Sequence, residues 1–390
     1  MNPASLDSLL PPPPVPDFAQ LQQVLLGQHK PARVHLVELF LDEEVMQEVA
    51  EGFLGWTWVP KAQMAVDTGQ RAQVWSADVP SEAYYAQLVA LYRRLGYDYV
   101  PILPIWQNHP APAARNRAQD TADLSRGERE WVLNAGSVAT REAADAFPWN
   151  KIRINPLPYE RAARHLPDGM KLMIVGSHFE HVWKNMVGYE KALYMIADEP
   201  DLIADLYQRW GQVVYDFYCE IIQRDDVGGI FHSDDLGFRT GTIVSPRFLR
   251  QHIFPWFKQY AALAHKQGKM FWLHSCGQIF NSIIEDLIED VRIDGLHSYQ
   301  DAVLPVSGFV ARFGQRVAAL GGVDVDKLAR MPEPEARAYV REILGRCMAA
   351  GRYALGTGNS VVNYIPVRNY LAMLDEGRRW RASDACTSCP

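Results

Sequence analysis

Cysteine is too scarce in this chain of 390 residues to build a disulfide framework. The five cysteines stand at positions 219, 276, 347, 386 and 389, whereas disulfide-stabilised domains are short and dense in cysteine. We therefore expect reduced thiols, some of them serving as metal ligands. Cys386 and Cys389 form a C-x-x-C pattern close to the end of the sequence, but no second pair accompanies them. We interpret this pair as structural or incidental.

The chain also lacks a surplus of positive charge and any long apolar run. Its 39 Lys and Arg residues against 46 Asp and Glu residues give a formal net charge of −7, so nucleic acid and anionic membrane surfaces are poor partners. No stretch approaches the roughly 18 apolar residues that a membrane-spanning helix needs. The first residues, MNPASLDSLLPPPPVPD, lack the charged and apolar regions of a signal peptide. We therefore expect a cytoplasmic protein.

Beyond an N-terminal arm, the chain alternates between short apolar runs and amphipathic segments. We assign residues 1–32 to the arm, because PPPPVP favours an extended polyproline conformation. Residues 33–380 form the main domain, and residues 381–390 form a tail. The eight apolar runs, rich in β-branched and aromatic residues, are 33–40, 97–105, 171–179, 228–236, 269–277, 293–301, 316–324 and 352–360.

Alternation of this kind implies parallel βαβ units, and eight units predict a (β/α)8 barrel of the α/β class. A doubly wound open sheet is the alternative, but no G-x-G-x-x-G pattern follows the first run. Residues 106–170 are far more than a βαβ crossover needs. We expect them to form an excursion from the barrel, which is a cap, a dimer contact, a docking surface or a solvated loop.

Polar residues of a chemically useful kind gather at the C-terminal end of each predicted strand. The ends of barrel strands form the catalytic mouth, so this pattern predicts an enzyme. The residues are Glu38, His178, Glu180, Asp234, Asp235, His274, Cys276, His297, Tyr299, Gln300, Asp324 and Asn359.

His274 and Cys276 are two residues apart, so in a strand their side chains face the same way. An imidazole and a thiolate on one face make half of a zinc site, although the H-x-C spacing alone is a weak signal. Asp234 and Asp235 are adjacent, so at most one points into the mouth, as a ligand, a partner of a ligating histidine, or an acid or base. His178 and Glu180 share a face by the same two-residue rule.

Five segments, taken together and in order, resemble the uroporphyrinogen decarboxylase superfamily over roughly residues 33–378. This superfamily of (β/α)8 barrels contains porphyrinogen decarboxylases and zinc-dependent methyltransferases. The segments are SHFEHVWKNMVGYEKALYMIADEPDLIADL (177–206), SDDLGFRTGTIVSPRFLRQHIFPWFKQ (233–259), KMFWLHSCGQI (269–279), LGGVDVDKLARM (320–331) and GTGNSVVNYIPVRNYLAMLDEGRR (356–379).

The decarboxylase branch fits this sequence poorly. True decarboxylases carry an Arg-Gln-Ala-Gly-Arg segment after the first strand, and its arginines hold the carboxylates of the substrate. The matching place here reads LVELFLDEEVMQEV, without an arginine. Glu38, Glu43 and Glu44 would repel a polycarboxylate substrate.

The methyltransferase branch fits better, because its members bind zinc through His-x-Cys and a distant cysteine. The resemblance implies that His274 and Cys276 are zinc ligands. Asn359 stands where the distant cysteine is expected, and an amide oxygen is a poor zinc ligand. We predict that Glu38 completes the metal site. Glu180 or one of the two aspartates is the alternative third ligand. Fewer thiolates leave a more Lewis-acidic metal, which favours demethylation of a donor over methylation of a thiol.

We therefore predict a zinc-dependent, demethylating methyltransferase acting on a small methylated substrate, for example an aryl methyl ether. The predicted methyl acceptor is a corrinoid (cobalamin) or tetrahydrofolate. A corrinoid would be carried by a separate protein, because this chain has no D-x-H-x-x-G corrinoid-binding pattern. Family members often dimerise, so a homodimer is a candidate assembly. The predicted catalytic residues are Asp234, Asp235 and His297, and the predicted substrate-binding residues are His178, Glu180, Tyr299 and Asn359.

Two other functions remain open from the sequence. One is a metal-independent decarboxylase or lyase that uses Asp234 or Asp235 together with His297. The other is a non-catalytic barrel that holds a corrinoid or tetrapyrrole.

Overall fold

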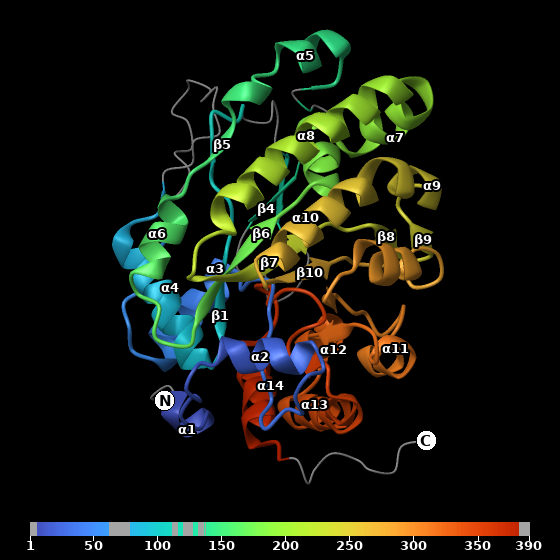
Figure 1. Ribbon diagram of the computed structural model, residues 1–390. Coiled ribbons are helices and arrows are strands. Elements are labelled where there is room, and N and C mark those ends of the chain that lie inside the picture. The colour runs from blue at the N-terminus through green and yellow to red at the C-terminus, as the bar shows by residue number, and fades with distance from the viewer. Residues whose placement is uncertain are drawn as a thin grey trace.

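The computed structural model describes residues 6–61, 79–110, 116–119, 128–131, 136 and 138–381 (Figure 1). The strands are β1 (Tyr99–Ile102), β2 (Trp106–Gln107), β3 (Asn116–Gln119), β4 (Glu128–Trp131), β5 (Arg153–Ile154), β6 (Lys171–Gly176), β7 (Val227–Ser233), β8 (Gly237–Phe238), β9 (Gly241–Thr242), β10 (Met270–His274), β11 (Gly295–His297), β12 (Ala318–Leu320) and β13 (Tyr353–Ala354). The helices are α1 (Leu6–Leu9), α2 (Phe18–Leu25), α3 (Glu43–Glu48), α4 (Glu82–Leu95), α5 (Arg141–Ala146), α6 (Leu157–Ala163), α7 (Tyr189–Asp198), α8 (Pro200–Ile221), α9 (Pro246–Phe248), α10 (Phe254–Lys266), α11 (Val306–Phe313), α12 (Val325–Arg330), α13 (Glu333–Cys347) and α14 (Val367–Arg379).

Seven parallel strands form the central sheet, in the order β1-β6-β7-β10-β11-β12-β13. The extended segment 34–41 supplies the eighth position, because Leu36 forms a parallel bridge with Leu355 beside β13. On its other side, the Tyr99 hydroxyl of β1 donates to the Glu38 carbonyl at 2.6 Å. The predicted (β/α)8 barrel is confirmed, and each of the seven later apolar runs contains one strand of this sheet.

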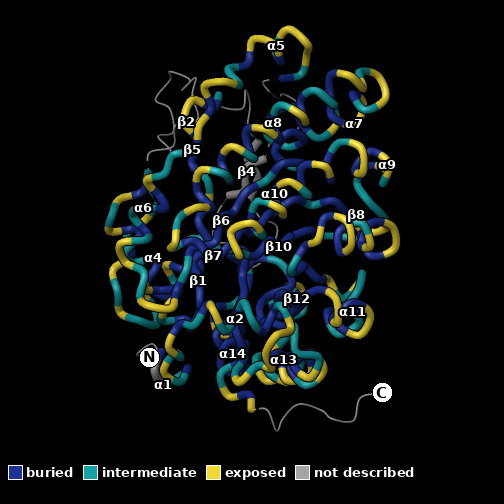
Figure 2. The backbone as a smooth tube through the Cα atoms, in the orientation of Figure 1, coloured by how far each residue is buried: buried dark blue, intermediate teal, exposed yellow. Residues whose placement is uncertain are grey.

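Helices cover the outside of the sheet. Figure 1 shows α8 and α10 on one side of the strands and α13 and α14 on the other. In Figure 2 the buried part of the backbone runs through the strands, whereas exposed residues gather on the outer turns of the helices. Continuously apolar strands such as β6 suit this position, because both faces of the sheet are covered.

Alternate residues of the strands fill the inside of the barrel, as the two-residue period of a strand requires. One buried cluster contains the inward-facing side chains together with three residues of α2. Its members are Phe18, Leu21, Leu25, Val37, Leu39, Tyr99, Met173, Val175, Phe231, Met270, Trp272, Ala318, Leu320 and Ala354. Helix α2 therefore closes one end of the barrel.

That end is the amino-terminal end of the strands, opposite the predicted mouth. The Phe18 N–H donates to the Gly169 carbonyl just before β6, and the Asp17 N–H donates to Asp98 just before β1. Asp98 is buried, which opposes its ionised form, but His35 and Arg33 outweigh that effect and hold its pKa below the usual range. The segment predicted as an arm is thus, from residue 17 on, a packed closure of the barrel.

The excursion predicted at 106–170 leaves the barrel after β1 and returns before β6. It contains the antiparallel pairs β2–β5 and β3–β4 and the helices α5 and α6. Arg141 of α5 pairs with Asp205 of α8, and Arg209 of α8 pairs with Asp145 of α5. These two ion pairs join the excursion to the outer layer of helices.

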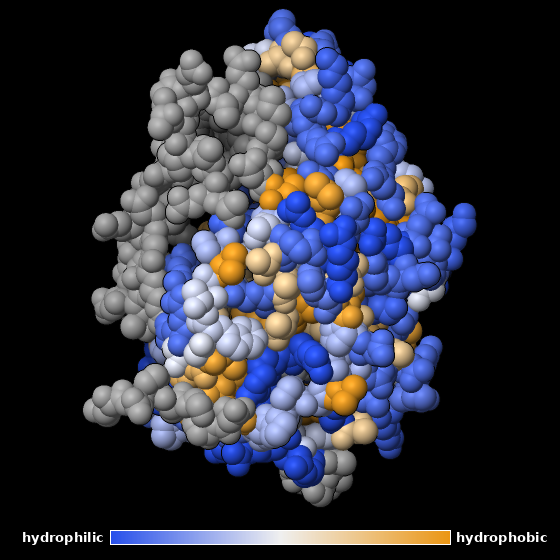
Figure 3. All heavy atoms as spheres, turned by 90° about the vertical axis from the view of Figure 1, so that its left-hand side faces the viewer, coloured by the Kyte–Doolittle hydropathy of each residue, from blue (hydrophilic) through white to orange (hydrophobic). Residues whose placement is uncertain are grey.

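Among the described residues, no helix is both long enough and apolar enough to cross a membrane. Figure 3 shows one face of the molecule, on the side of α4 and α6, as a largely hydrophilic surface with several small hydrophobic patches. Leu103 and Leu157 are two of the few large apolar side chains that remain exposed.

The closure by α2 predicts a stability effect far from the mouth. Leu21 is fully buried inside the barrel, so Leu21→Ala is expected to lower the free energy of unfolding by about 2–5 kcal/mol. Ala19 on the exposed side of the same helix is the control, and Ala19→Ser is expected to change stability by at most ~0.5 kcal/mol. Urea denaturation measures both. Equal effects of the two substitutions would contradict the packing of α2 against the barrel interior.

Candidate metal site at the barrel mouth

Asp235, His274 and Cys276 bring three potential ligand atoms together at the carboxyl ends of β7 and β10. These atoms lie within 4.8 Å of one another. Trp272 faces the inside of the barrel, so His274 and Cys276, two and four residues further on, continue on the same face. The shared face predicted for these two residues is present in the structure, and Asp235 rather than Glu38 joins them.

The distances from Nε2 of His274 to the other two ligand atoms match those expected around a tetrahedral metal ion. Nε2 of His274 lies 3.5 Å from Sγ of Cys276 and 3.4 Å from Oδ1 of Asp235. Zinc–ligand bonds of about 2.0–2.3 Å at a tetrahedral angle would place N and S about 3.6 Å apart and N and O about 3.4 Å apart. The side chains could thus bind a metal ion with little movement.

The charges in this site favour an added cation. Burial opposes ionisation of Asp235, but hydrogen bonds from His274 and from the Cys276 N–H outweigh it and hold its pKa below the usual range. Burial and the nearby Asp235 raise the pKa of Cys276 well above its usual value. A metal cation would reverse this second effect, because a coordinating thiol loses its proton.

Two side chains are directed at the sulfur of Cys276. Nδ2 of Asn359 donates to Sγ at 3.1 Å, and the Ser298 hydroxyl lies 3.2 Å from it. Hydrogen bonds to the charged form of a group stabilise that form, so these donors would stabilise a thiolate. Asn359, predicted as a substrate-binding residue, therefore contacts a candidate ligand. Ser298 was missed by the sequence analysis, and only its position beside His297 could have indicated it.

His297 lies behind His274, and both of its ring nitrogens are already engaged. Its Nδ1 lies 2.7 Å from Nδ1 of His274, and its Nε2 lies 3.1 Å from the carbonyl of Thr357. Burial and the neighbouring His274 hold the pKa of His297 well below its usual range. Because both ring nitrogens are engaged by His274 and Thr357, this geometry does not support the predicted role of His297 as a catalytic acid or base.

Glu38 lies outside the triad and does not complete it. Its flanking residues Val37 and Leu39 face the barrel interior, so its side chain turns to the opposite face. The carboxylate accepts the Thr357 N–H at 2.7 Å and the Thr357 hydroxyl at 2.6 Å. Burial raises the pKa of Glu38 to about 8. Asp235, rather than Glu38, therefore lies with His274 and Cys276, and this geometry does not support the prediction of Glu38 as the third ligand.

Asp234 points away from the mouth and is saturated with hydrogen bonds. Its carboxylate accepts the backbone N–H groups of His178, Phe179 and Glu180 and the Ser177 hydroxyl. His232 approaches Oδ2 of Asp234 at 2.7 Å. This aspartate fixes the turn after β6. Because both of its oxygens are engaged by hydrogen bonds, this geometry does not support its predicted catalytic role.

His178 and Tyr299 also face away from the mouth. Met173 and Val175 of β6 face the interior, so His178 faces the helices, where its Nε2–H donates to the Tyr207 carbonyl. The Tyr299 hydroxyl donates to the Leu296 carbonyl at 2.9 Å. The structure therefore brings neither residue to the triad, although both were predicted to bind substrate.

Glu180 lies close enough to Asp235 for their charges to interact. Burial and the charge of Asp235 raise the pKa of Glu180 to about 8, against the opposing effect of Lys184. Lys184 also hydrogen-bonds to Tyr189. Burial and Asp235 therefore both favour the neutral form of Glu180. The sequence analysis predicted Glu180 but not Tyr189, for which the sequence carries no signal.

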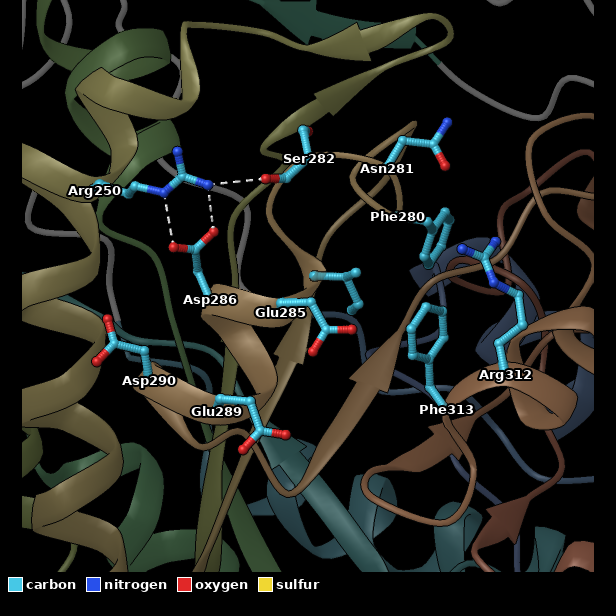
Figure 4. A pocket seen from close by; sticks show the side chains of 11 residues that line it. Arg250, Phe280, Asn281, Ser282, Glu285, Asp286, Glu289, Asp290, Arg312 and Phe313 are labelled. Carbon is cyan, nitrogen blue, oxygen red and sulfur yellow. Dashed lines mark hydrogen bonds and ion pairs between the residues drawn. The ribbon is translucent and has the colours of Figure 1, made fainter.

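A hollow of about 540 Å3 lies elsewhere on the surface, between α11 and the helical turn Asp286–Val291 (Figure 4). Arg250 pairs with Asp286 there, and Arg316 pairs with Glu285 and Glu289. None of the predicted site residues lines this hollow. Its lining of paired surface charges gives no reason to prefer it to the mouth.

Asp234 and Asp235 are adjacent, yet replacing each by Asn is expected to affect stability and zinc binding in opposite proportions. Asp234→Asn is expected to lower the free energy of unfolding by about 3 kcal/mol or more, because it disrupts a buried pair with His232. Asp235 keeps 34% of its side chain exposed, so Asp235→Asn should change stability less. It should weaken zinc binding by more than the roughly 10–100-fold typical of outer-shell partners. Denaturation and zinc titration separate the two effects. A stability loss confined to Asp235→Asn would contradict these assignments.

Comparison with solved structures and family models agrees with this architecture. The fold is similar to that of a methyltransferase from Methanosarcina mazei, with a TM-score of 0.61 and 13% identity, covering 96% of this chain and 98% of that one. A xylanase, XynB from Paenibacillus barcinonensis, gives a TM-score of only 0.34 at 10% identity, over 56% of this chain and 80% of that one. No curated protein matches the sequence. The family model described as uroporphyrinogen decarboxylase (URO-D) matches residues 175–380, and the chain belongs to this family.

Proposed function

We propose that this protein is a zinc-dependent methyltransferase that removes a methyl group from a small methylated substrate. The observation that supports this most is the triad of a carboxylate, an imidazole and a thiol at the barrel mouth. Asp235 takes the place of one thiolate, and Asn359 occupies the position where the resemblance led us to expect that thiolate. A site with one thiolate suits a leaving oxygen or nitrogen better than a thiol acceptor.

The donor set fits zinc better than a hard cation. Imidazole nitrogen and thiolate sulfur are preferred zinc ligands, whereas calcium and magnesium take oxygen ligands. Asp235, His274 and Cys276 would hold the ion and leave a fourth position open, as in catalytic zinc sites. When bound, zinc would supply a Lewis acid for the heteroatom that carries the methyl group.

Glu180 is the residue best suited to protonate the departing heteroatom. Burial and Asp235 raise the pKa of its carboxyl, which favours the neutral form, and a neutral acid can donate a proton to a leaving group. Lys184 lies close enough to Glu180 and Tyr189 to orient both. As the proton donor, Glu180 takes the place of Asp234 and Asp235, which the sequence analysis predicts as catalytic residues.

The methyl acceptor would be a corrinoid carried by a separate protein, since this chain has no corrinoid-binding pattern of its own. Tetrahydrofolate is the second acceptor to test, and an aryl methyl ether is the first methyl donor to test. The rival metal-independent lyase has less support, because it would rely on His297 and Asp234, and their polar atoms are already engaged.

The proposed function is tested by metal analysis and turnover together. The purified protein is expected to bind about one zinc per chain, and Cys276→Ala should lose it, because three protein ligands are the usual minimum of a catalytic zinc site. With zinc, free cob(I)alamin and an aryl methyl ether, methylcobalamin should accumulate and be visible by absorbance.

Glu180→Gln should keep the zinc but lower the rate by roughly 100–10,000-fold, the usual contribution of a general acid. Full turnover of any substrate by a metal-free preparation would overturn the proposal. A spectral change on adding cobalamin, without a demethylated product from any methyl ether tested, would favour the non-catalytic barrel.

A variant of Asn359 tests separately whether fewer thiolate ligands make the metal a stronger Lewis acid. Asn359→Cys would offer a second thiolate close to Cys276, so zinc should bind roughly tenfold or more tightly. Demethylation should become slower, because the added negative charge reduces the Lewis acidity of the metal. Cobalt(II) substitution would report the new thiolate as a stronger charge-transfer absorption. Unchanged turnover in a variant that shows this absorption would contradict the argument.

A further inference from the structure

Three buried polar residues have no part in the chemistry proposed above, yet they form one continuous chain behind His274. They are His297 at the end of β11, Thr357 after β13, and Glu38 in the extended segment 34–41. Each is fully enclosed. Buried polar groups that form a network with every member paired hold their positions more firmly than isolated pairs. This arrangement suggests a function in holding something in place.

A backbone carbonyl can only accept a hydrogen bond, and this determines where His297 carries its proton. The Thr357 carbonyl lies 3.1 Å from Nε2 of His297, so that nitrogen is the protonated one. Nδ1 of the same neutral ring then has a lone pair, and Nδ1 of His274 faces it at 2.7 Å. One of these two nitrogens must donate, so Nδ1 of His274 carries the proton. Nε2 of His274 is then the nitrogen that faces Asp235, at 3.4 Å, and it is the one available to a metal ion.

If His297 were positively charged, its Nδ1 would donate and Nδ1 of His274 would accept. The surroundings of His297 disfavour this charge. One ring nitrogen faces a carbonyl and the other a second imidazole, and the ring is completely buried. Among the described residues, no carboxylate contacts either nitrogen. An enclosed imidazolium would therefore bear the desolvation cost of an unpaired charge.

Glu38 holds the Thr357 peptide from the other side. It accepts both the N–H and the hydroxyl of Thr357, at 2.7 and 2.6 Å. The preceding Gly356 allows this approach, because a Cβ there would lie 1.8 Å from the Val37 carbonyl. The carbonyl that orients His297 is thus fixed by a contact between the first and last strand positions of the barrel.

We propose that Glu38, Thr357 and His297 form a positioning relay that holds a proton of His274 on Nδ1 and directs its Nε2 at Asp235 and Cys276, where a metal ion can bind it. The inference rests on the metal site of the proposed function. The direction of its hydrogen bonds, however, is also a property of the metal-free protein. The three are positioning residues, because they act through His274, which is the member of the chain of hydrogen bonds that contacts Asp235 and Cys276.

The direction of the relay is tested in the unmodified protein by long-range 1H–15N NMR of the histidine rings. In the metal-free protein at neutral pH, His274 is expected to carry a proton on Nδ1. His297 is expected as the tautomer protonated at Nε2. The two signals are assigned by their loss in His274→Gln and His297→Gln. A His274 ring without a proton on Nδ1 overturns the proposal, whatever the protein catalyses.

Its effect on metal binding is tested with matched pairs of variants in competition with a chromophoric zinc chelator. His297→Leu, which removes both nitrogens, is expected to weaken zinc binding about 10–100-fold. His297→Asn keeps an acceptor near the Nδ1 position and should lose less. Glu38→Leu should also weaken binding, whereas Glu38→Gln, which can still accept the Thr357 N–H, should retain most of it.

Circular dichroism checks that each variant is folded, and affinity is expressed per folded, zinc-competent chain. Wild-type zinc affinity in folded His297→Leu overturns the relay. Zinc binding and the expected tautomers without any methyl transfer would contradict the proposed function alone and support the relay. The two failures are therefore distinguishable.

Discussion

The alternation of side chains across the barrel wall is the constraint on which the site depends. A strand directs successive residues to opposite faces, and in this barrel one face is a packed interior while the other meets a layer of helices. Trp272, His274 and Cys276 follow the inward face of β10, whereas His232 and His178 follow the outward faces of β7 and β6. A shift of one residue in β10 would turn both candidate ligands toward the helices.

Burial of the barrel wall then determines how its carboxylates are paired. Because a buried polar atom without a partner is costly, the outward-facing carboxylates are engaged by neighbouring segments. Asp234 accepts the N–H groups of the turn after β6, and Glu38 accepts two hydrogen bonds from Thr357. Asp235 lies beyond the end of β7, where the mouth opens, and its carboxylate is left to meet His274. The carboxylates differ in function because their surroundings differ, although their chemistry is almost the same.

The closure of the opposite end shows the same dependence on burial. The proline-rich segment reads as an extended arm, since proline favours that conformation. The eight residues after it nevertheless form a helix whose apolar side fills the bottom of the barrel. Nothing in residues 1–32 alone indicates this, because the surface that α2 covers is assembled from strands spread over the whole chain.

The sequence by itself determined the eight βα units, the shared face of His274 and Cys276, and the resemblance to the family. Each of these depends on residues that are close together or on patterns repeated along the chain. Only the tertiary structure decided that Asp235 completes the triad and that Asn359 donates to the sulfur. Those contacts join Cys276 to residues 41 and 83 positions away. Partners at such separations are set by the register and curvature of neighbouring strands, which local sequence patterns do not specify.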